Sequence, residues 1–246
     1  MKLLFSRFGG KGRKADEIIS YFTKHETYVE AFLGSGAIFL AKEQSSLSVL
    51  NDLDPLVYNI FNLSKQYGEE FDKKEWDWTP NRERWKTFRK SITEKTGLNP
   101  LELLYRSIYV IHNSWSGIGT SYTPTRRSNP KYLVKLGDYK SILSKALIFN
   151  EDYVNIIKKY DGDNTLFYLD PPYDIALTKK YYEYDNGMTL ESLAEIMRSM
   201  KGKCCLSLDI TPKTTELFKD FNLHKIEFQY NTGKRVKKEE YLITNY

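Results

Sequence analysis

Apolar residues in the first 70 positions alternate between helical spacing and short continuous runs. Residues 14–24 and 55–67 each carry one apolar face, a pattern that is typical of amphipathic helices. Residues 28–32 and 47–50 are short apolar runs that favour buried strands, and residues 38–43 open a further helix. This β-α-β-α order predicts a parallel sheet covered by helices.

The alternation stops near residue 70 and does not return before residue 142. The stretch between them is polar, basic and aromatic, and it contains all 4 tryptophans. Residues 91–95 and 101–112 have helical patterns within it. Residues 114–131 are rich in Ser, Thr, Gly and Pro, which predicts an irregular loop.

The strand and helix pattern resumes after this stretch. The expected elements are, in order, strand 147–149, helix 153–159, strand 166–169, helix 190–200, strand 204–208 and helix 212–220. Two alternating runs, residues 225–230 and 240–244, flank the turn signal NTGK and predict an antiparallel hairpin. We predict an α/β fold whose mostly parallel sheet and C-terminal hairpin comprise residues 1–69 and 143–246, with residues 70–142 as a mainly helical insert.

Several function classes lose support from the composition. The 246 residues hold no apolar run of membrane-spanning length, so no membrane association is expected. Cys204 and Cys205 are neighbours in an apolar run and predict buried strand thiols in a reducing compartment. His25, His112 and His224 are scattered along the chain, and no metal site is expected from them.

Positive charge is concentrated in the middle of the chain. The net charge is +5, but residues 73–145 contain 15 Lys and Arg against 6 Asp and Glu, and the remainder contains 22 against 26. Clustered Lys and Arg neutralise phosphates, so a nucleic acid is one candidate partner. A solvated basic face is the other interpretation.

A glycine turn and an acidic residue follow the first two predicted strands. Gly34 and Gly36 separate a strand from a helix and leave room for a ligand. Asp52 ends the next strand, where an acid commonly binds ribose hydroxyls, although Asp52 or Asp54 could instead cap the following helix. Phe39 replaces the third glycine of a dinucleotide motif, which favours a smaller nucleoside ligand.

The sequence TLFYLDPPYDIAL ends another predicted strand with two prolines. One interpretation is a plain Pro-Pro turn, because proline cannot continue a strand ladder. The other is a rigid platform that presents the carboxylate of Asp170 and the ring of Tyr173 at the carboxyl edge of the sheet. Because the glycine turn and Asp52 are expected at the same edge, the platform is the favoured interpretation.

Motifs along the chain are similar to those of a known family. They are GGK at residues 9–11, AFLGSGA at 31–37, NDLDP at 51–55, NEDY at 150–153, DPPY at 170–173 and EEYLITNY at 239–246. In this order they resemble the Dam-type, alpha-class DNA adenine-N6 methyltransferases. The resemblance implies a Rossmann-like S-adenosylmethionine-dependent methyltransferase fold. Arg7 stands where that family usually has an aromatic residue, and residues 113–133 lack its NGLCRYN and VPFG patterns.

The resemblance also implies a reaction, in which a methyl group passes from S-adenosylmethionine to N6 of an adenine flipped out of duplex DNA. Asp170 and the Pro171 carbonyl would accept the N6 hydrogens, Pro172 would stiffen the turn, and Tyr173 would stack on the base. The implied cofactor-binding residues are Lys11, Phe32, Gly34, Ser35, Gly36, Asp52, Asp152 and Tyr153. Asp152 could instead cap the helix that follows it.

Within the predicted insert we expect DNA contacts. The candidates are Arg82, Arg84, Lys86, Arg89, Asn113, Ser116, Arg126 and Arg127. The expected partner is double-stranded DNA, bound by a monomer or weak dimer, and the implied location is the cytoplasm of a bacterium or a phage-infected host. The alternatives are a cytosine-N4 methyltransferase, an RNA adenine methyltransferase, or a catalytically silent nucleic-acid-binding protein of the same fold.

Overall fold

The computed structural model describes residues 2–94, 97–124, 135–172, 187–231 and 235–246. The strands are β1 (Thr27–Glu30), β2 (Leu47–Asn51), β3 (Ala146–Phe149), β4 (Thr165–Leu169), β5 (Lys203–Asp209), β6 (Asn222–Asn231) and β7 (Arg235–Thr244). The helices are η1 (Gly12–Lys14), α1 (Ala15–Ile19), α2 (Ala37–Ala41), α3 (Pro55–Phe71), α4 (Arg82–Thr93), α5 (Pro100–His112), η2 (Trp115–Gly117), η4 (Leu136–Tyr139), α6 (Lys140–Ser144), α7 (Tyr153–Tyr160), α9 (Leu190–Ser199) and α10 (Pro212–Leu217).

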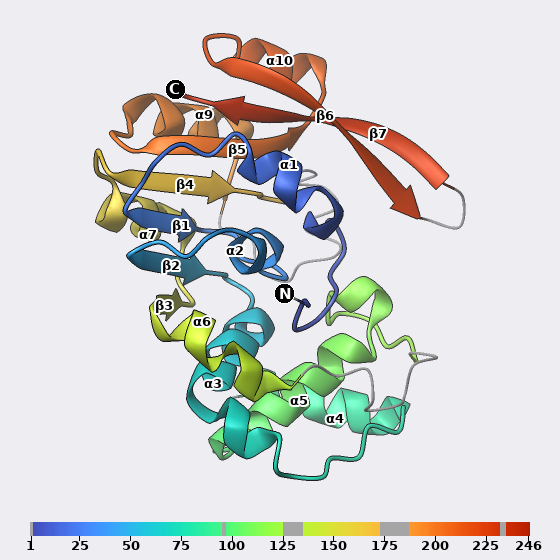
Figure 1. Ribbon diagram of the computed structural model, residues 1–246. Helices are drawn as coiled ribbons and strands as arrows, with labels where there is room; N and C mark the ends of the chain where they lie inside the picture. Colours follow the sequence, from blue (N-terminus) through green and yellow to red (C-terminus); the bar gives the residue numbers. More distant parts are fainter. Residues whose placement is uncertain (1, 95–96, 125–134, 173–186, 232–234) are drawn as a thin grey trace.

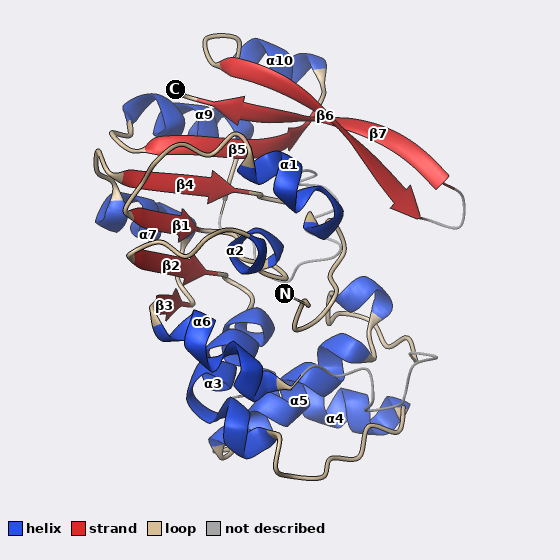
Figure 2. Ribbon diagram, in the orientation of Figure 1, coloured by secondary structure: helices blue, strands red, loops and turns tan. Residues whose placement is uncertain are grey.

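The seven strands form one sheet in the order β3-β2-β1-β4-β5-β7-β6 (Figures 1 and 2). The first five strands in this order are parallel, and β7 and β6 complete the edge as an antiparallel hairpin. The predicted α/β class, with a mostly parallel sheet and a C-terminal antiparallel hairpin, is therefore confirmed. The hairpin strands are longer than expected, because β7 begins in the charged run RVKKEE, where apolar alternation gives no signal.

Side chains alternate between the two faces of the sheet and build one hydrophobic cluster on each. Tyr28, Leu166 and Cys205 pack on the face covered by α1, α2 and α3. Val29 and Cys204 pack on the other face, with α7 and α9. The adjacent cysteines are buried, free thiols that point to opposite sides of β5, as expected of strand residues.

Helices α3, α4 and α5 pack together beside the edge of the sheet that β3 forms (Figure 2). Trp85 of α4 is buried and donates its Nε1–H to the Val110 carbonyl of α5 at 2.9 Å. The sequence predicted a helix only over residues 91–95, which overlaps the last three residues of α4, because the apolar stripe of Trp85, Phe88 and Ile92 lies among charged residues. One hydrophobic cluster joins these helices to a face of the sheet. Within the described ranges, no helix is long and apolar enough to cross a membrane.

Candidate active site

The central strands β1 and β4 lie side by side, and the chain leaves them in opposite directions. Glu30 at the end of β1 pairs with Tyr168 of β4. From β1 the chain passes through α2 to β2, whereas from β4 it passes through α9 to β5 on the other side. Open α/β sheets bind ligands in the crevice beyond such a pair of strand ends. The structure therefore brings the glycine turn after β1 and Asp170 after β4 to one place.

The glycine turn is tight on one side and open on the other. Gly34 and Gly36 have φ angles of +51° and +66°, a region that favours glycine. A Cβ on Gly36 would lie 2.6 Å from Cζ of the buried Phe61, whereas a Cβ on Gly34 would meet nothing within 4 Å. The space next to the Gly34 Cα is therefore open, and a ligand can enter it where a side chain would otherwise lie.

Two aspartates after β2 have different contacts. Asp52 accepts a hydrogen bond from Gly34 N at 2.7 Å, which ties it to the glycine turn. Asp54 caps α3 by accepting from Leu56 N and forms a buried 2.7 Å ion pair with Arg7, so the capping alternative is confirmed for Asp54. Burial raises the pKa of Asp52, and the nearby Arg7 charge opposes that effect.

An aromatic pair lies beside the same turn. The ring of Phe32, two residues before Gly34, packs on Tyr153 with centroids 5.1 Å apart and an interplanar angle of 34°. Tyr153 is buried at the start of α7. Asp152 caps this helix by accepting from Val154 N at 2.8 Å, which confirms the capping alternative.

Lys11 contacts the carboxylate of the DPPY motif. Its ammonium lies 2.9 Å from Asp170 Oδ1 and 3.4 Å from Glu240 Oε2, and both Lys11 and Glu240 are almost fully buried. Burial alone would lower the pKa of Lys11, but Asp170 and Glu240 outweigh that effect and raise it. Pro171 is buried and Pro172 is half-buried, whereas Tyr173 lies outside the described residues.

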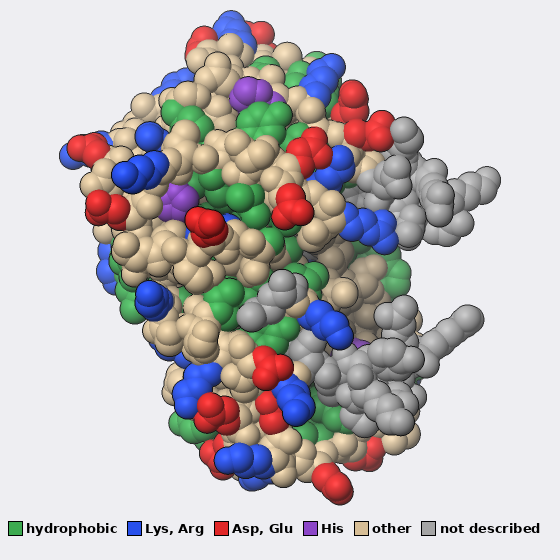
Figure 3. Space-filling model, viewed as in Figure 1, with side chains coloured by type: hydrophobic (Ala, Val, Ile, Leu, Met, Phe, Trp, Pro, Cys, Tyr) green, Lys and Arg blue, Asp and Glu red, His purple; other side chains and the backbone are tan. Residues whose placement is uncertain are grey.

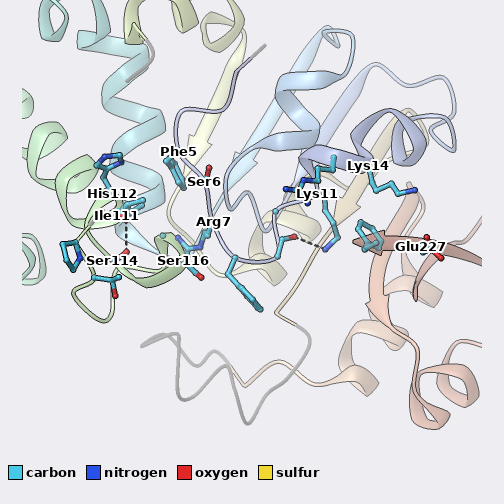
Figure 4. A pocket seen from close by; sticks show the side chains of 18 residues that line it. Phe5, Ser6, Arg7, Lys11, Lys14, Ile111, His112, Ser114, Ser116 and Glu227 are labelled. Carbon is cyan, nitrogen blue, oxygen red and sulfur yellow. Dashed lines mark hydrogen bonds between the residues drawn. The ribbon is translucent and has the colours of Figure 1, made fainter. Parts of the chain in front are cut away.

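A pocket of about 790 Å³ lies next to this ion pair (Figure 4). The N-terminal segment with Arg7 and Lys11 crosses it between the end of α5, marked by His112 and Ser114, and Glu227 of β6. Its lining side chains include four cations, Arg7, Lys11, Arg13 and Lys14, and one acid, Glu227. The pocket thus combines a basic lining with access to the N-terminal segment that contacts Asp170.

The structure separates the expected DNA-binding residues into several groups. Arg82 and Lys86 are exposed on α4, Arg84 pairs with Asp77 at 2.6 Å, and Arg89 donates to the Gly119 carbonyl. Asn113 is fully buried and donates to the Tyr109 carbonyl, so its side chain is not available at the surface as predicted.

The other candidates lie after α5 in the chain. Ser116 lines the pocket. Arg126 and Arg127 lie outside the described residues. Basic and acidic side chains are interspersed on the face seen in Figure 3.

Some residues at the site were not among the predicted site residues. Glu240 lies in a charged run, and only the pairing of β7 with β5 makes it a neighbour of Lys11. Arg13 and Lys14 line the pocket although the basic excess pointed to residues 73–145. In the part of the chain that the structure describes, no three His, Cys, Asp or Glu side chains form a group that could hold a metal ion.

The chain is similar in sequence to known bacterial methyltransferases. A Type II methyltransferase of Lactococcus lactis subsp. cremoris, M1.LlaDCHI, is 26% identical over 98% of this chain and 95% of its own length. The DNA adenine methylase of Escherichia coli K12 is 24% identical over 95% of this chain and 91% of its own length. Among solved structures, a precorrin-6y C5,15-methyltransferase of Geobacter metallireducens aligns at 10% identity over 95% of this chain and 87% of its own, with a TM-score of 0.40.

The strongest assignment comes from a family profile that matches residues 8–232, a range that includes the glycine turn, Asp52 and the DPPY motif. The match covers most of the chain. The chain therefore belongs to the D12 class of N6 adenine-specific DNA methyltransferases.

Proposed function

We propose that this methyltransferase acts on an adenine extruded from duplex DNA, with Asp170 as the residue that orients the reacting N6 amino group. The observation that carries the proposal is that Asp170, after β4, and the glycine turn, after β1, follow the ends of two paired strands and so lie near each other. Such a site can hold a methyl donor and an acceptor base together, and orientation of this kind supplies much of the rate of a transfer reaction.

The residues around the glycine turn fit S-adenosylmethionine, the methyl donor that the family implies. The open side of Gly34 gives space for the donor, Asp52 has the carboxylate that ribose hydroxyls prefer, and the Phe32–Tyr153 pair offers aromatic surface for an adenine ring. When bound, the donor would supply an electrophilic methyl group on a sulfonium. We also assign Lys11 and Ser35 to the binding of the methyl donor. Asp152 would contribute indirectly, because it caps the helix that begins with Tyr153.

Asp170 would act as a hydrogen-bond acceptor for the target base. The N6 lone pair of adenine is delocalised into the ring, so it must be drawn out of conjugation to attack a methyl carbon. A carboxylate accepts several hydrogen bonds at once, so the contact with Lys11 is compatible with a second contact to N6–H. The Pro171 carbonyl would accept the other N6 hydrogen, Pro172 would stiffen the turn, and Tyr173 would stack on the base. The proton can leave after transfer, because the methylated amino cation is far more acidic.

Double-stranded DNA is the proposed substrate, bound by a monomer or a weak dimer in the cytoplasm. We assign residues 1–69 and 143–246 to catalysis and residues 70–142 to target recognition. The exposed Arg82 and Lys86 would contact phosphates, which fixes position without reading sequence. Access to the adenine N6 requires the base to leave the helix, because the enzyme cannot reach it within the stack.

An Asp170→Asn variant tests the proposal. It retains the size of the side chain but replaces an acceptor oxygen with an amide, so methylation should fall by about 100-fold or more. Binding of S-adenosylmethionine, measured by calorimetry, should be retained. The matched control is Asp163→Asn, an exposed acid just before β4, which should retain full activity. Full activity of Asp170→Asn would reject the role given to Asp170.

The modified base identifies the substrate. Methylation-sensitive sequencing of DNA from cells that express the protein reports both the base and its sequence context. We expect N6-methyladenine at one short motif. Modification of cytosine alone would refute the adenine assignment, and binding of DNA without any modification would favour the silent binding protein.

A further inference from the structure

A buried ion pair joins the N-terminal segment to the residue that precedes α3. The guanidinium of Arg7 lies 2.7 Å from Asp54 Oδ2, and the two side chains are only 5% and 8% exposed. Both groups lose hydration in such a place, so a buried ion pair is weak evidence for a contribution to stability alone. Asp54 is two residues from Asp52, the acid that we assign to the methyl donor.

Hydrogen bonds connect this ion pair to the glycine turn. Asp54 N donates to Asp52 Oδ1 at 2.9 Å, and Gly34 N donates to Asp52 Oδ2 at 2.7 Å. Each carboxylate oxygen of Asp52 thus has a backbone donor and retains a further lone pair for a ligand. The second oxygen of Asp54 accepts from Leu56 N in the first turn of α3. The place of Asp52 therefore depends on Asp54, which Arg7 and α3 hold.

The backbone that carries Arg7 is fixed on both sides of this residue. Phe8 N donates to the Ser116 carbonyl at 2.9 Å, after α5 in the chain. On the other side, a Cβ on Gly117 would lie 2.0 Å from the Ser6 carbonyl oxygen, so the two backbones pack closely. The side chain of Arg7 therefore extends from a segment that is already ordered, and little further ordering is needed when a ligand binds nearby.

Charge is a second connection between Arg7 and Asp52. Burial raises the pKa of Asp52, the Arg7 cation opposes that effect, and the Asp54 carboxylate adds to it. The turn after β1 and the loop after β3 contribute neutral groups, namely Gly34 N and the side-chain amide of Asn150, which donates to the Asp52 carbonyl at 2.8 Å. Arg7 thus offsets both burial and the neighbouring carboxylate, and favours the ionised form of Asp52.

The ionised form is the one that suits a ribose. A carboxylate only accepts hydrogen bonds, whereas a protonated acid uses one oxygen as a donor, and the ribose hydroxyls can donate to both oxygens of a carboxylate. Lys11, four residues after Arg7, lies 2.9 Å from Asp170. One segment therefore brings a buried cation to the carboxylate on each side of the proposed transfer, Asp52 on the donor side and Asp170 on the acceptor side.

We propose that Arg7 is a positioning residue for the methyl donor, and that it holds Asp52 ionised and oriented to accept the ribose hydroxyls. The inference rests on the proposed function, because it requires that Asp52 binds the donor. Arg7 acts through the two aspartates and does not touch the donor itself. The affinity for the donor therefore falls at acidic pH, and Arg7 sets the pH at which it falls.

Calorimetric titration with S-adenosylmethionine between pH 5.5 and pH 8.5 tests this role. Arg7→Met removes the cation, so the pH at which affinity is lost should rise by about one to three units. Relative to the wild type, the dissociation constant should increase by about tenfold or more at pH 5.5 and by about threefold or less at pH 8.5. The donor's own groups titrate alike in both experiments and cancel in this ratio. Arg7→Lys retains the positive charge and should retain most of the affinity.

Two further variants separate charge from loss of structure, because Arg7→Met leaves buried Asp54 without the guanidinium at 2.7 Å. Asp54→Asn alone removes a like charge near Asp52 and should move the loss of affinity to lower pH. Asparagine is also a favoured N-cap residue, so α3 remains capped. The double variant of Arg7→Met and Asp54→Asn lacks both opposing charges and should recover most of the affinity at pH 5.5.

The matched control is another arginine ion pair. Arg106→Met breaks the 2.8 Å pair with Glu102 on α5, away from the two aspartates, and should bind S-adenosylmethionine as the wild type does over the same pH range.

The outcomes distinguish this inference from the proposed function. If the wild type binds S-adenosylmethionine and the Arg7→Met profile coincides with it, the positioning role is wrong and the proposed function stands. A loss that is equal at every pH and that Asp54→Asn does not reverse would also overturn the role, because a structural defect has no such pH dependence. A wild type that does not bind S-adenosylmethionine would overturn the proposed function itself.

Discussion

Lys11 Nζ lies 2.9 Å from Asp170 Oδ1, although 159 residues separate the two in the chain. Glu240 Oε2 lies 3.4 Å from the same ammonium. The three side chains come from the N-terminal segment, the end of β4 and the hairpin strand β7, so the sheet assembles them. One buried cation shared by two carboxylates keeps Asp170 in a fixed place and compensates part of its charge.

Replacement of Lys11 by methionine should reduce activity and shift its pH dependence. Asp170 would then lie near a second carboxylate without the compensating cation, which disfavours its ionised form. We expect the acid limb of the pH–rate profile to move to higher pH by about one to three units. Lys14→Met, which removes a partly exposed lysine of the same segment, should leave the profile in place. A Lys11→Met profile that coincides with the wild type would contradict the assigned role of the ion pair.

Glu240→Gln tests the third member of the cluster. The amide retains the shape of the side chain but removes its charge, so the buried ammonium of Lys11 would lose one of the two carboxylates that lie within 3.4 Å of it. The free energy of unfolding should fall by about 1.5 to 3 kcal/mol, as for hydrogen bonds to charged groups, and methylation should slow. The exposed neighbour gives a matched control, since Glu239→Gln should change neither quantity in urea unfolding and methylation assays. Equal behaviour of the two variants would contradict a positioning role for Glu240.

Local patterns predicted the parallel core and the glycine turn because both depend on residues close in sequence. Buried strands are recognisable as apolar runs in the sequence. Gly34 and Gly36 indicate a turn whose positive φ angles favour glycine. The partners of Lys11 could not be predicted in this way. They depend on which strand ends meet and on the pairing of β7 with β5, and no local pattern encodes that contact.

The two glycines of the turn should respond differently to alanine. Gly36→Ala would meet both an unfavourable φ and the Phe61 ring at 2.6 Å, so a loss on the order of 3 kcal/mol in unfolding free energy is expected. Gly34→Ala faces only the unfavourable φ, and should lose about 1 to 2 kcal/mol. Its methyl group would instead enter the open side of the turn, so calorimetry should show weaker binding of S-adenosylmethionine. Gly97→Ala, in open space without a positive φ, is the control. Unchanged cofactor affinity in Gly34→Ala would contradict the proposal that the cofactor occupies the open space beside Gly34.

Glu30 should make stability depend on pH near neutrality. It is buried at the end of β1, where it accepts hydrogen bonds from Tyr28 Oη and Phe39 N. Burial raises its pKa to about 8, the nearby Asp170 charge adds to that effect, and the Tyr28 hydrogen bond and Lys42 oppose it. The folded protein therefore holds a proton that the unfolded chain releases above its ordinary pKa of 4.5. Stability should fall with rising pH between these two values.

A comparison with Glu30→Gln isolates this effect, because glutamine does not titrate. The difference in unfolding free energy, wild type minus variant, should fall by about 1.4 kcal/mol for each pH unit between pH 5 and pH 8, and level off above it. Urea unfolding at pH 5, 6, 7 and 8 measures it, and Glu26→Gln, an exposed acid just before β1, should give no such slope. If the Glu30→Gln and wild-type profiles run parallel, Glu30 is ionised in the folded protein, and its carboxylate charge then lies permanently beside Asp170.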